Sequence, residues 1–214
     1  MRRRLGTFFI ALGVTLLIAA LVWLAYNQWD NWRAGKSAAE IQEVLGSAED
    51  EAKANQNDGS GLPDDLADED GVREMGTLII EGNAYIGTLS IPKYGLELPI
   101  MAEWSYPGLR IAPCRYQGSV WTDDMILCGH NYDRHFGNLK NLEPGDEISF
   151  VDVDGNEFYY EVAEVVILQP TDVEEMISRE TGEWDLTLFT CTIGGQTRVT
   201  VRCTRVDEPE DNAS

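Results

Sequence analysis

The sequence predicts an all-β domain, a sandwich or a barrel, behind a membrane-spanning helix. From Asn83 to Val206, short runs of β-forming residues alternate with turn signals made of Gly, Pro, Asn and Asp. Ahead of them, residues 8–26 carry no charged side chain, and as a helix of about 28 Å this run would cross the hydrocarbon core of a bilayer. These observations set the fold class: all-β, with an N-terminal transmembrane helix and a few short helices.

The apolar run has the flanks of a membrane anchor. Three arginines, Arg2 to Arg4, precede it, and basic residues favour the cytoplasmic side. Aromatic residues that suit the far interface follow: Trp23, Tyr26, Trp29 and Trp32. We expect residues 1–32 to form a cytoplasmic end and a single-pass anchor in the cell membrane, with the rest extracellular. The alternative, a cleaved signal peptide, would also export the domain, but no small-x-small cleavage pattern closely follows the run.

Residues 33–82 are expected to form an acidic extracellular spacer, partly helical or disordered. The stretch from Ser47 to Glu74 is rich in Asp, Glu, Gly and Ala and cannot bury enough apolar surface to fold, whereas residues 38–46 favour a short helix. Residues 207–214 are expected to be a disordered acidic tail. The formal net charge of −21 excludes nucleic acid as a partner, because phosphate binding needs a basic stripe.

The expected domain, residues 83–206, divides into strands at its turn signals. A hairpin is predicted around Pro92 and Gly95, and Asp154-Gly155 gives a strong signal for a second hairpin. The predicted strands lie within residues 84–91, 96–103, 124–131, 147–168 (two runs), 184–192 and 197–206. Short helices are predicted over residues 135–142 and 171–180.

Few residues can carry chemistry. The two histidines are His130, which ends a strand after Gly129, and His135; each alone is more often structural. Cys191 ends the buried run "LTLFTC", and a free cysteine usually only packs. Arg198 and Arg202 share one face of their strand by its period of two, and the opposite face carries Val199, Val201 and Cys203.

The joint pattern resembles the sortases, the cysteine transpeptidases of Gram-positive cell surfaces. "TLFTC" (187–191) matches their TLxTC signature, "GHN" stands at the end of an earlier strand, and an arginine opens a β-run seven residues after Cys191. The resemblance implies a sortase-like closed β-barrel of about eight strands over residues 83–206. It assigns catalysis to His130, Cys191 and Arg198, with Thr190 as an oxyanion donor or substrate-positioning residue. Strand periodicity leaves Arg202 open as the alternative to Arg198.

The implied reaction cuts an LPXTG-like sorting motif after its threonine through a thioacyl-enzyme and passes the acyl group to an amine. The implied partners are the sorting-motif peptide of a secreted surface protein or pilin, and an amine of a peptidoglycan precursor or a pilin lysine. No cofactor and no metal are implied. A groove partly walled by residues 170–183 is expected to bind the peptide. The implied chemistry can start from a thiol and an imidazole that have ordinary pKa values. It can also start from a papain-like ion pair, in which the pKa of the thiol is strongly lowered.

The same residues allow other interpretations. A hydrolytic cysteine protease would share the site and differ in the acceptor. Zinc could use the ligand types of Cys128, His130, Cys191 and Cys203, but their spacing fits no compact zinc motif. A non-catalytic surface module would leave the thiols packed. A disulfide among Cys114, Cys128 and Cys203 is also open, since one bridge there would leave Cys191 free.

Overall fold

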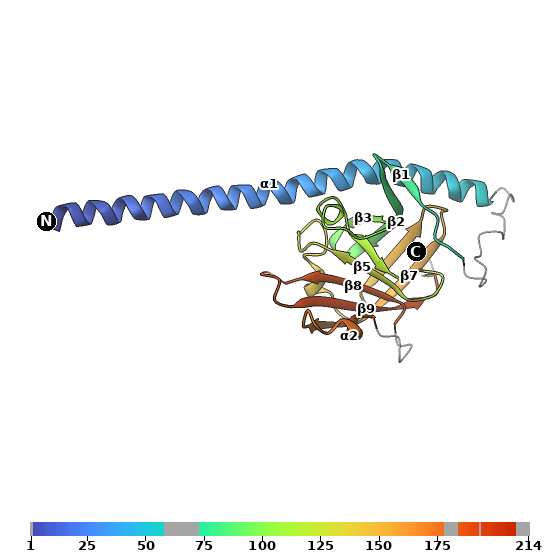
Figure 1. Cartoon of the computed structure of the whole chain (residues 1–214). Coiled ribbons are helices and arrows are strands. Elements are labelled where there is room, and N and C mark those ends of the chain that lie inside the picture. Colours follow the sequence, from blue (N-terminus) through green and yellow to red (C-terminus); the bar gives the residue numbers. More distant parts are fainter. Residues whose placement is uncertain (1, 58–72, 178–183, 193, 209–214) are drawn as a thin grey trace, which may run out of the picture.

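The protein is a closed β-barrel attached to one long helix (Figure 1). The computed structural model describes residues 2–57, 73–177, 184–192 and 194–208. Eight strands form the ring, in the order β2-β3-β4-β5-β8-β9-β7-β6, and β6 pairs with β2 to close it. The predicted closed barrel of about eight strands is therefore confirmed. A further short strand, β1 (Leu78–Ile80), pairs with β2 outside the ring.

The ring strands match the predicted runs, with one addition. Their bounds are β2 (Asn83–Ile91), β3 (Leu96–Met101), β4 (Cys114–Gln117), β5 (Met125–Gly129), β6 (Glu147–Asp152), β7 (Glu157–Leu168), β8 (Leu186–Cys191) and β9 (Arg198–Val206). The sequence did not predict β1 or β4, which are too short to show a periodic pattern. Most neighbours are antiparallel, but β5 runs parallel to β8, and β3 pairs with β4 in parallel at Met101 and Cys114.

The barrel interior is apolar because alternate residues of each strand face it. In β8, Leu186 and Leu188 are fully buried in the main core, and in β9 Val201 and Cys203 join them. The predicted alternation of β9 is confirmed, since Arg198 and Arg202 are only partly buried. Residues of β8 and β9 with the other parity therefore face outward.

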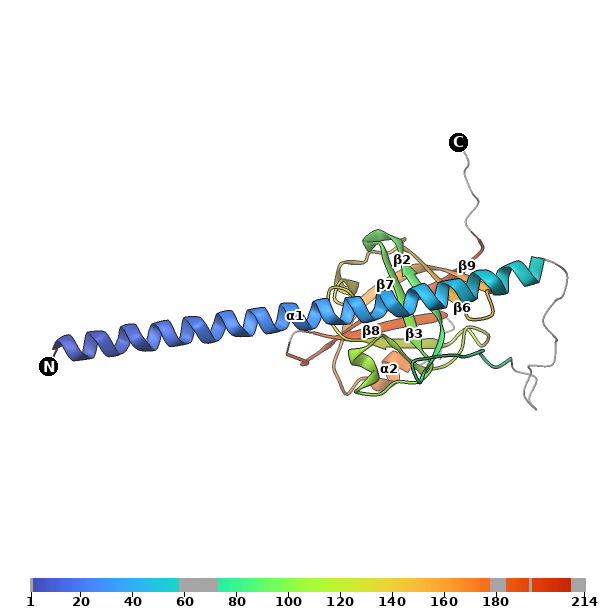
Figure 2. The same ribbon diagram turned by 90° about the horizontal axis from the view of Figure 1, so that it is seen from above.

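The long helix α1 (Arg2–Asn57) has an exposed apolar half and a half that packs on the barrel (Figures 1 and 2). Its residues Phe9–Tyr26 form the one span among the described residues that is long and apolar enough to cross a membrane. In the second half, Ile41 and Leu45 pack in a smaller apolar cluster with Tyr85. Within the expected spacer, residues 33–57 are helical, so the helix is longer than the short one expected over residues 38–46. The barrel supplies the apolar surface that the acidic segment lacks.

The remaining short helices lie between strands. They are η2 (Pro92–Tyr94), η3 (Gly108–Arg110), η4 (Leu139–Asn141) and α2 (Val173–Ile177). The helix predicted over residues 135–142 is shorter than expected, a single 3-10 turn. The helix predicted over residues 171–180 forms over five residues, and residues 178–180 lie outside the described part of the chain, as do residues 209–214 of the predicted tail.

Candidate active site

The parallel pair β5–β8 brings His130 next to Cys191. The last residues in register are Gly129 and Thr190, so the next residues along the two chains are His130 and Cys191. The Thr190 hydroxyl donates a hydrogen bond to the Gly129 carbonyl oxygen at 2.8 Å and is itself buried. Side chains in register on parallel strands point to the same face, so imidazole and thiol share one edge of the barrel.

The antiparallel pair β8–β9 places an arginine on the other side of the thiol. Arg198 lies directly opposite Cys191 in the register. Its guanidinium donates from Nη1 to the carbonyl oxygens of Gly195 and Thr197, both at 3.1 Å. These bonds go to neutral peptide groups of its own hairpin, which leaves its positive charge available to a developing oxyanion.

Arg202 lies in a different environment on the same strand face. Its Nη1 atom is 2.6 Å from a carboxylate oxygen of Glu164, and Nη2 donates to the Glu175 carbonyl oxygen at 2.7 Å. The guanidinium carbon also lies 4.1 Å from the centre of the Trp184 ring. Its register partner in β8 is Thr187, four residues before Cys191. The geometry therefore brings Arg198, rather than Arg202, to the thiol.

The four cysteines, all of which are free and described, differ in burial. Burial raises the pKa of Cys114 to about 11 and, with the nearby Cys114 and Cys191 thiols contributing, that of Cys128 to about 12. Cys203 is fully buried in the core, and burial raises its pKa as well. Cys191 alone of the four is partly exposed. It is therefore the cysteine best placed to react with a substrate.

The loop after β5 fixes the backbone of His130. The Phe136 amide donates to the His130 carbonyl oxygen at 3.1 Å, and the Phe136 ring fills the space that a Cβ at residue 129 would need. The His130 and Tyr132 rings lie 5.1 Å apart, and the Tyr132 and His135 rings 5.5 Å apart. His135 is fully buried, and burial together with the charge of His130 lowers its pKa to about 4. We interpret His135 as structural.

A row of aromatic rings leads away from the thiol over the outer surface. Phe189 has the parity of Cys191 and makes an edge contact with Tyr116, with ring centres 5.6 Å apart. Tyr116 contacts Trp104, which in turn contacts Tyr106. A hollow of about 450 Å³ beside this row is lined by Trp104, Tyr116 and Arg115. Sequence reasoning missed this surface, although the parity of Phe189 pointed to it.

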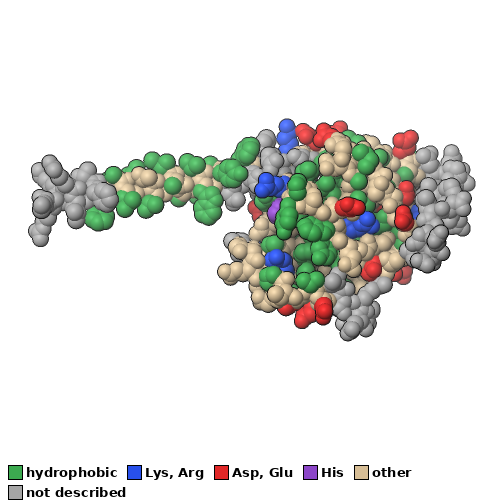
Figure 3. Space-filling model, in the orientation of Figure 1, with side chains coloured by type: hydrophobic (Ala, Val, Ile, Leu, Met, Phe, Trp, Pro, Cys, Tyr) green, Lys and Arg blue, Asp and Glu red, His purple; other side chains and the backbone are tan. Residues whose placement is uncertain are grey.

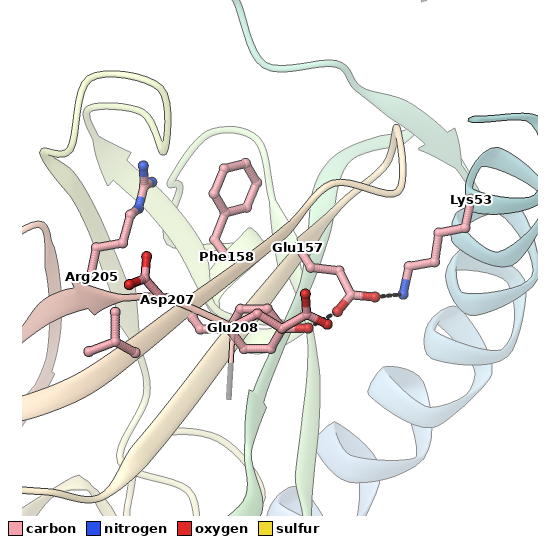
Figure 4. Close-up of a pocket in the computed structure, with 8 residues that line it drawn as sticks. Lys53, Glu157, Phe158, Arg205, Asp207 and Glu208 are labelled. Carbon is pink, nitrogen blue, oxygen red and sulfur yellow. Dashed lines mark hydrogen bonds and ion pairs between the residues drawn. The ribbon is translucent and has the colours of Figure 1, made fainter. Parts of the chain in front are cut away.

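The expected groove wall is only partly described. Helix α2 contacts Arg202 through the Glu175 carbonyl oxygen. Arg202 pairs with Thr187 near the start of β8, whereas Cys191 is the last residue of that strand. Residues 178–183 lie outside the described part of the chain. A larger cleft, of about 710 Å³, lies at the other end of the barrel between Lys53, Glu157 and Arg205 (Figure 4). Val206, at the end of β9, lines this cleft, whereas Arg198 and Cys191 lie at the other end of β9.

The four ligands of a zinc site do not converge. Cys203 faces the core, whereas Cys128 and Cys191 have the outward parity. Across the described residues, no group of three or more His, Cys, Asp or Glu side chains could hold a metal ion. The arrangement instead provides a thiol between an imidazole and a guanidinium, which is suited to attack on a carbonyl carbon and to stabilisation of the oxyanion.

Comparison with known proteins identifies the family. The family model described as a sortase domain matches residues 89–206, more than half of the chain. The chain belongs to the sortase family. This sortase is 26% identical to Sortase A of Bacillus anthracis over 129 residues. The aligned region covers 58% of this chain and 60% of that protein. It is 31% identical over 108 residues to Sortase D of Bacillus subtilis (strain 168), covering 49% and 53% of the two chains.

A solved structure has the same fold. Sortase C1 from Streptococcus suis superposes with a TM-score of 0.51 at 26% identity, over 60% of this chain and 76% of that one. The chain spans only 53 to 60% of the length of the two curated relatives. The family model covers the barrel from Leu89, near the end of β2, to the end of β9, and this part contains His130, Cys191 and Arg198.

Proposed function

We propose that this sortase is a membrane-anchored cysteine transpeptidase with Cys191 as its nucleophile. The observation that carries the proposal is the strand register, in which Cys191 follows the Gly129–Thr190 pair beside His130 and stands opposite Arg198. Membership of the sortase family supports the same assignment. The catalytic domain is proposed to span residues 83–206.

In the first half of the reaction, the Cys191 thiolate attacks the carbonyl carbon of the residue before the scissile bond. The tetrahedral oxyanion accepts hydrogen bonds from the Arg198 guanidinium. The His130 imidazolium then gives its proton to the leaving amine, the peptide C–N bond breaks, and a thioester to Cys191 remains.

In the second half, an amine replaces the thiol. Neutral His130 takes the proton of the incoming amine, which attacks the thioester carbonyl, and a new amide forms as the Cys191 thiolate leaves. Hydrolysis uses the same steps with water as the acceptor, which is the protease alternative. A thioester favours transfer because amines attack it readily while it still survives long enough to meet one.

Thr190 is proposed to position the site rather than to donate to the oxyanion. Its hydroxyl already donates to the Gly129 carbonyl oxygen, and its side chain is buried on the face opposite Cys191. The bond ties the ends of β5 and β8 together at the last residue pair before His130 and Cys191. A shift of the two strands would separate the imidazole from the thiol.

The proposed substrate is an LPXTG-like sorting motif, cut after its threonine, of a secreted surface protein or pilin. The aromatic row from Phe189 to Trp104 offers an apolar surface beside the thiol for the residues before the scissile bond. The proposed acceptor is an amine of a peptidoglycan precursor or a pilin lysine. We propose that Phe9–Tyr26 spans the cell membrane with the N-terminus in the cytoplasm and the barrel outside.

The test uses the full-length protein in detergent with a library of LPXTG-like peptides and triglycine as acceptor. We expect a joined product that mass spectrometry identifies, and no product with Cys191→Ala. Release of only the free acid with the parent protein would favour the protease alternative. Equal turnover by the parent and by Cys191→Ala would overturn the proposal.

A further inference from the structure

The helix α1 joins the proposed membrane span to the barrel without a break. It is helical from Arg2 to Asn57, so the apolar part Phe9–Tyr26 and the packed part from Ala38 onward belong to one rod. Figures 1 and 2 show this rod running straight past one side of the barrel. The orientation of the barrel relative to the membrane is then set by how the second half of the rod is packed.

Several contacts fix the barrel on the rod. Leu45 is fully buried in the apolar cluster between α1 and the strands. About one turn before Leu45, the Gln42 amide donates to the Thr88 hydroxyl at 3.0 Å, and one turn after Leu45 the Glu49 carboxylate accepts a hydrogen bond from the same hydroxyl at 2.7 Å. At the next turn, Lys53 pairs with Glu157 at 2.5 Å (Figure 4).

A glycine at the β6–β7 turn adds a close contact. Gly155 has a positive φ of 81°. A Cβ at this position would lie 2.9 Å from the backbone nitrogen of Lys53. The turn therefore lies directly against the helix, and this contact, with the apolar and polar ones, holds the barrel at a defined angle to the rod.

The two ends of the barrel lie at different positions along α1. Arg134, in the loop that follows His130, lines a hollow with Ala38 and Gln42, near the start of the packed part. The far end of β9, at Val206, lines the cleft with Lys53, fifteen residues further along α1. Since β9 starts at Arg198, the edge with the proposed catalytic residues faces the membrane span. In Figure 1 the β8–β9 hairpin points toward the N-terminal part of α1.

The rod also sets the height of this edge. From Tyr26 to Ala38 a helix rises about 18 Å, and the headgroup layer on one side of a bilayer takes up roughly 5 to 8 Å of that rise. The start of the packed part therefore stands about 10 Å above the headgroups. An extended tripeptide spans about 10 Å, so an acceptor peptide fixed to a lipid would just reach this height.

We propose that α1 is a rigid spacer that holds the catalytic edge facing the bilayer at a fixed height, so that the enzyme selects an amine acceptor attached at the membrane surface. Arg134 is exposed at this edge and Arg198 is partly exposed, but Asp133 beside Arg134 is exposed as well, and Figure 3 shows both basic and acidic side chains at this end of the barrel. The height of the edge, rather than its charge, is therefore what selects the acceptor. The inference rests on the proposed transpeptidase function and on the proposed membrane span.

The experiment raises the barrel above the bilayer without changing any active-site residue. Seven helix-forming residues are inserted between Gly35 and Lys36 of the full chain, which raises the barrel by about 10 Å and turns it by only about 20°. The protein is placed in vesicles with triglycine coupled directly to a phospholipid headgroup, and in a second assay with free triglycine. The control variant carries the same seven residues after Asn57, beyond the packed part of α1.

We expect the insertion at Gly35 to lower transfer to the lipid-linked triglycine by about tenfold or more, because a tether that cannot span the gap has an effective concentration near zero. Transfer to free triglycine should stay within about twofold of the parent for both insertions, which shows that each variant folds. A fourteen-residue insertion should lower lipid-linked transfer at least as far.

Unchanged transfer to lipid-linked triglycine in the seven- and fourteen-residue variants would overturn the rigid spacer and leave the transpeptidase proposal standing. An equal loss with the insertion after Asn57 would also overturn it. Failure of the parent to join free triglycine would instead overturn the proposed function.

Discussion

Two arginines on one face of β9 show how neighbouring regions of the same strand differ. Arg198 donates to peptide carbonyls of its hairpin, opposite Cys191, whereas Arg202 pairs with Glu164 and lies over Trp184. The second arginine has its charge balanced by a carboxylate, so it holds β9 to β7 and to α2. Among the described residues, no carboxylate forms an ion pair with Arg198, which fits its proposed role at the oxyanion. The interaction partner, rather than the residue type or the strand face, therefore distinguishes the proposed catalytic arginine from the structural one.

The largest expected effect comes from substitutions that compare the partly exposed thiol of Cys191 with the buried thiol of Cys128. Cys191→Ala should lower the rate of peptide cleavage by at least about a thousandfold, because the acyl group then has no nucleophile to join. Cys128→Ala should stay within a few-fold of the parent, since its thiol is buried and its pKa is raised to about 12. Peptide cleavage followed by chromatography measures both. Comparable losses in the two variants would contradict the assignment of Cys191.

Substitution of the two arginines tests the comparison directly. Arg198→Ala should lower kcat/KM by about a hundredfold, the usual cost of one oxyanion donor, with little change in thermal stability. Arg202→Ala should lower the free energy of unfolding by about 0.5 to 1.5 kcal/mol, because the half-exposed Glu164 carboxylate and the exposed Glu175 carbonyl exchange their hydrogen-bond partner for water. Its kcat/KM should change only a few-fold. The reverse pattern would make Arg202 the functional arginine.

Removal of the Thr190 hydroxyl should have a smaller effect. Thr190→Val keeps the shape but leaves the Gly129 carbonyl oxygen without its donor. We expect kcat to fall by about tenfold while KM changes little, because the strand ends that carry His130 and Cys191 lose a bond between them. Thr190→Ser restores the donor and should recover most of the rate. If Thr190→Ser is as slow as Thr190→Val, the bond does not position the site.

The smallest expected effect is on the pH dependence of stability, through the Glu49 carboxyl group. Burial raises the pKa of Glu49 from 4.5 to about 7; the charges of Asp152 and Asp50 raise it further, whereas the Thr88 hydrogen bond and Lys53 lower it. A raised pKa favours the protonated form in the packed state. The stabilisation is therefore fully present below about pH 4.5 and is lost as the pH rises through about 7.

Glu49→Gln should remove this pH dependence, because the amide cannot ionise. Chemical unfolding from pH 4 to pH 8 measures it, and spin labels on α1 and on the barrel report whether the helix stays packed. The parent should lose stability across this window more steeply than the variant. Parallel curves would show that Glu49 does not control the packing of the helix.

Local patterns predicted most strands and an all-β domain, a sandwich or a barrel, whereas the closed barrel was implied by the resemblance to the sortases. The Asp154-Gly155 turn and the alternation of Val199, Val201 and Cys203 each needed only neighbouring residues, and both are present. The packing of α1 was not predicted, because Ile41 and Leu45 find their apolar partners only in the folded barrel. The composition of the stretch that begins at Ser47 gave no sign of a packed helix, but residues 47–57 are helical and contact the barrel, for example through Lys53 and Glu157.

The candidate site residues likewise divide into those that a local motif predicts and those that depend on residues distant in the chain. The family signature singled out His130, Cys191 and Arg198, but strand periodicity left Arg202 equivalent to Arg198. The difference depends on Glu164, which is 38 positions away in the chain and pairs through β7. The aromatic row beside Phe189 likewise combines residues of β8, β4 and the loop after β3. No local pattern contains such a set.

The crossover between β5 and β8 has a consequence for the order of events during synthesis. Gly129 and Thr190, whose bond joins the two halves of the site, are separated by 61 positions in the chain. The imidazole therefore emerges well before the thiol, and the last two strands must be made before the pair can meet. A nascent chain therefore cannot assemble the proposed site until both β8 and β9 have been made.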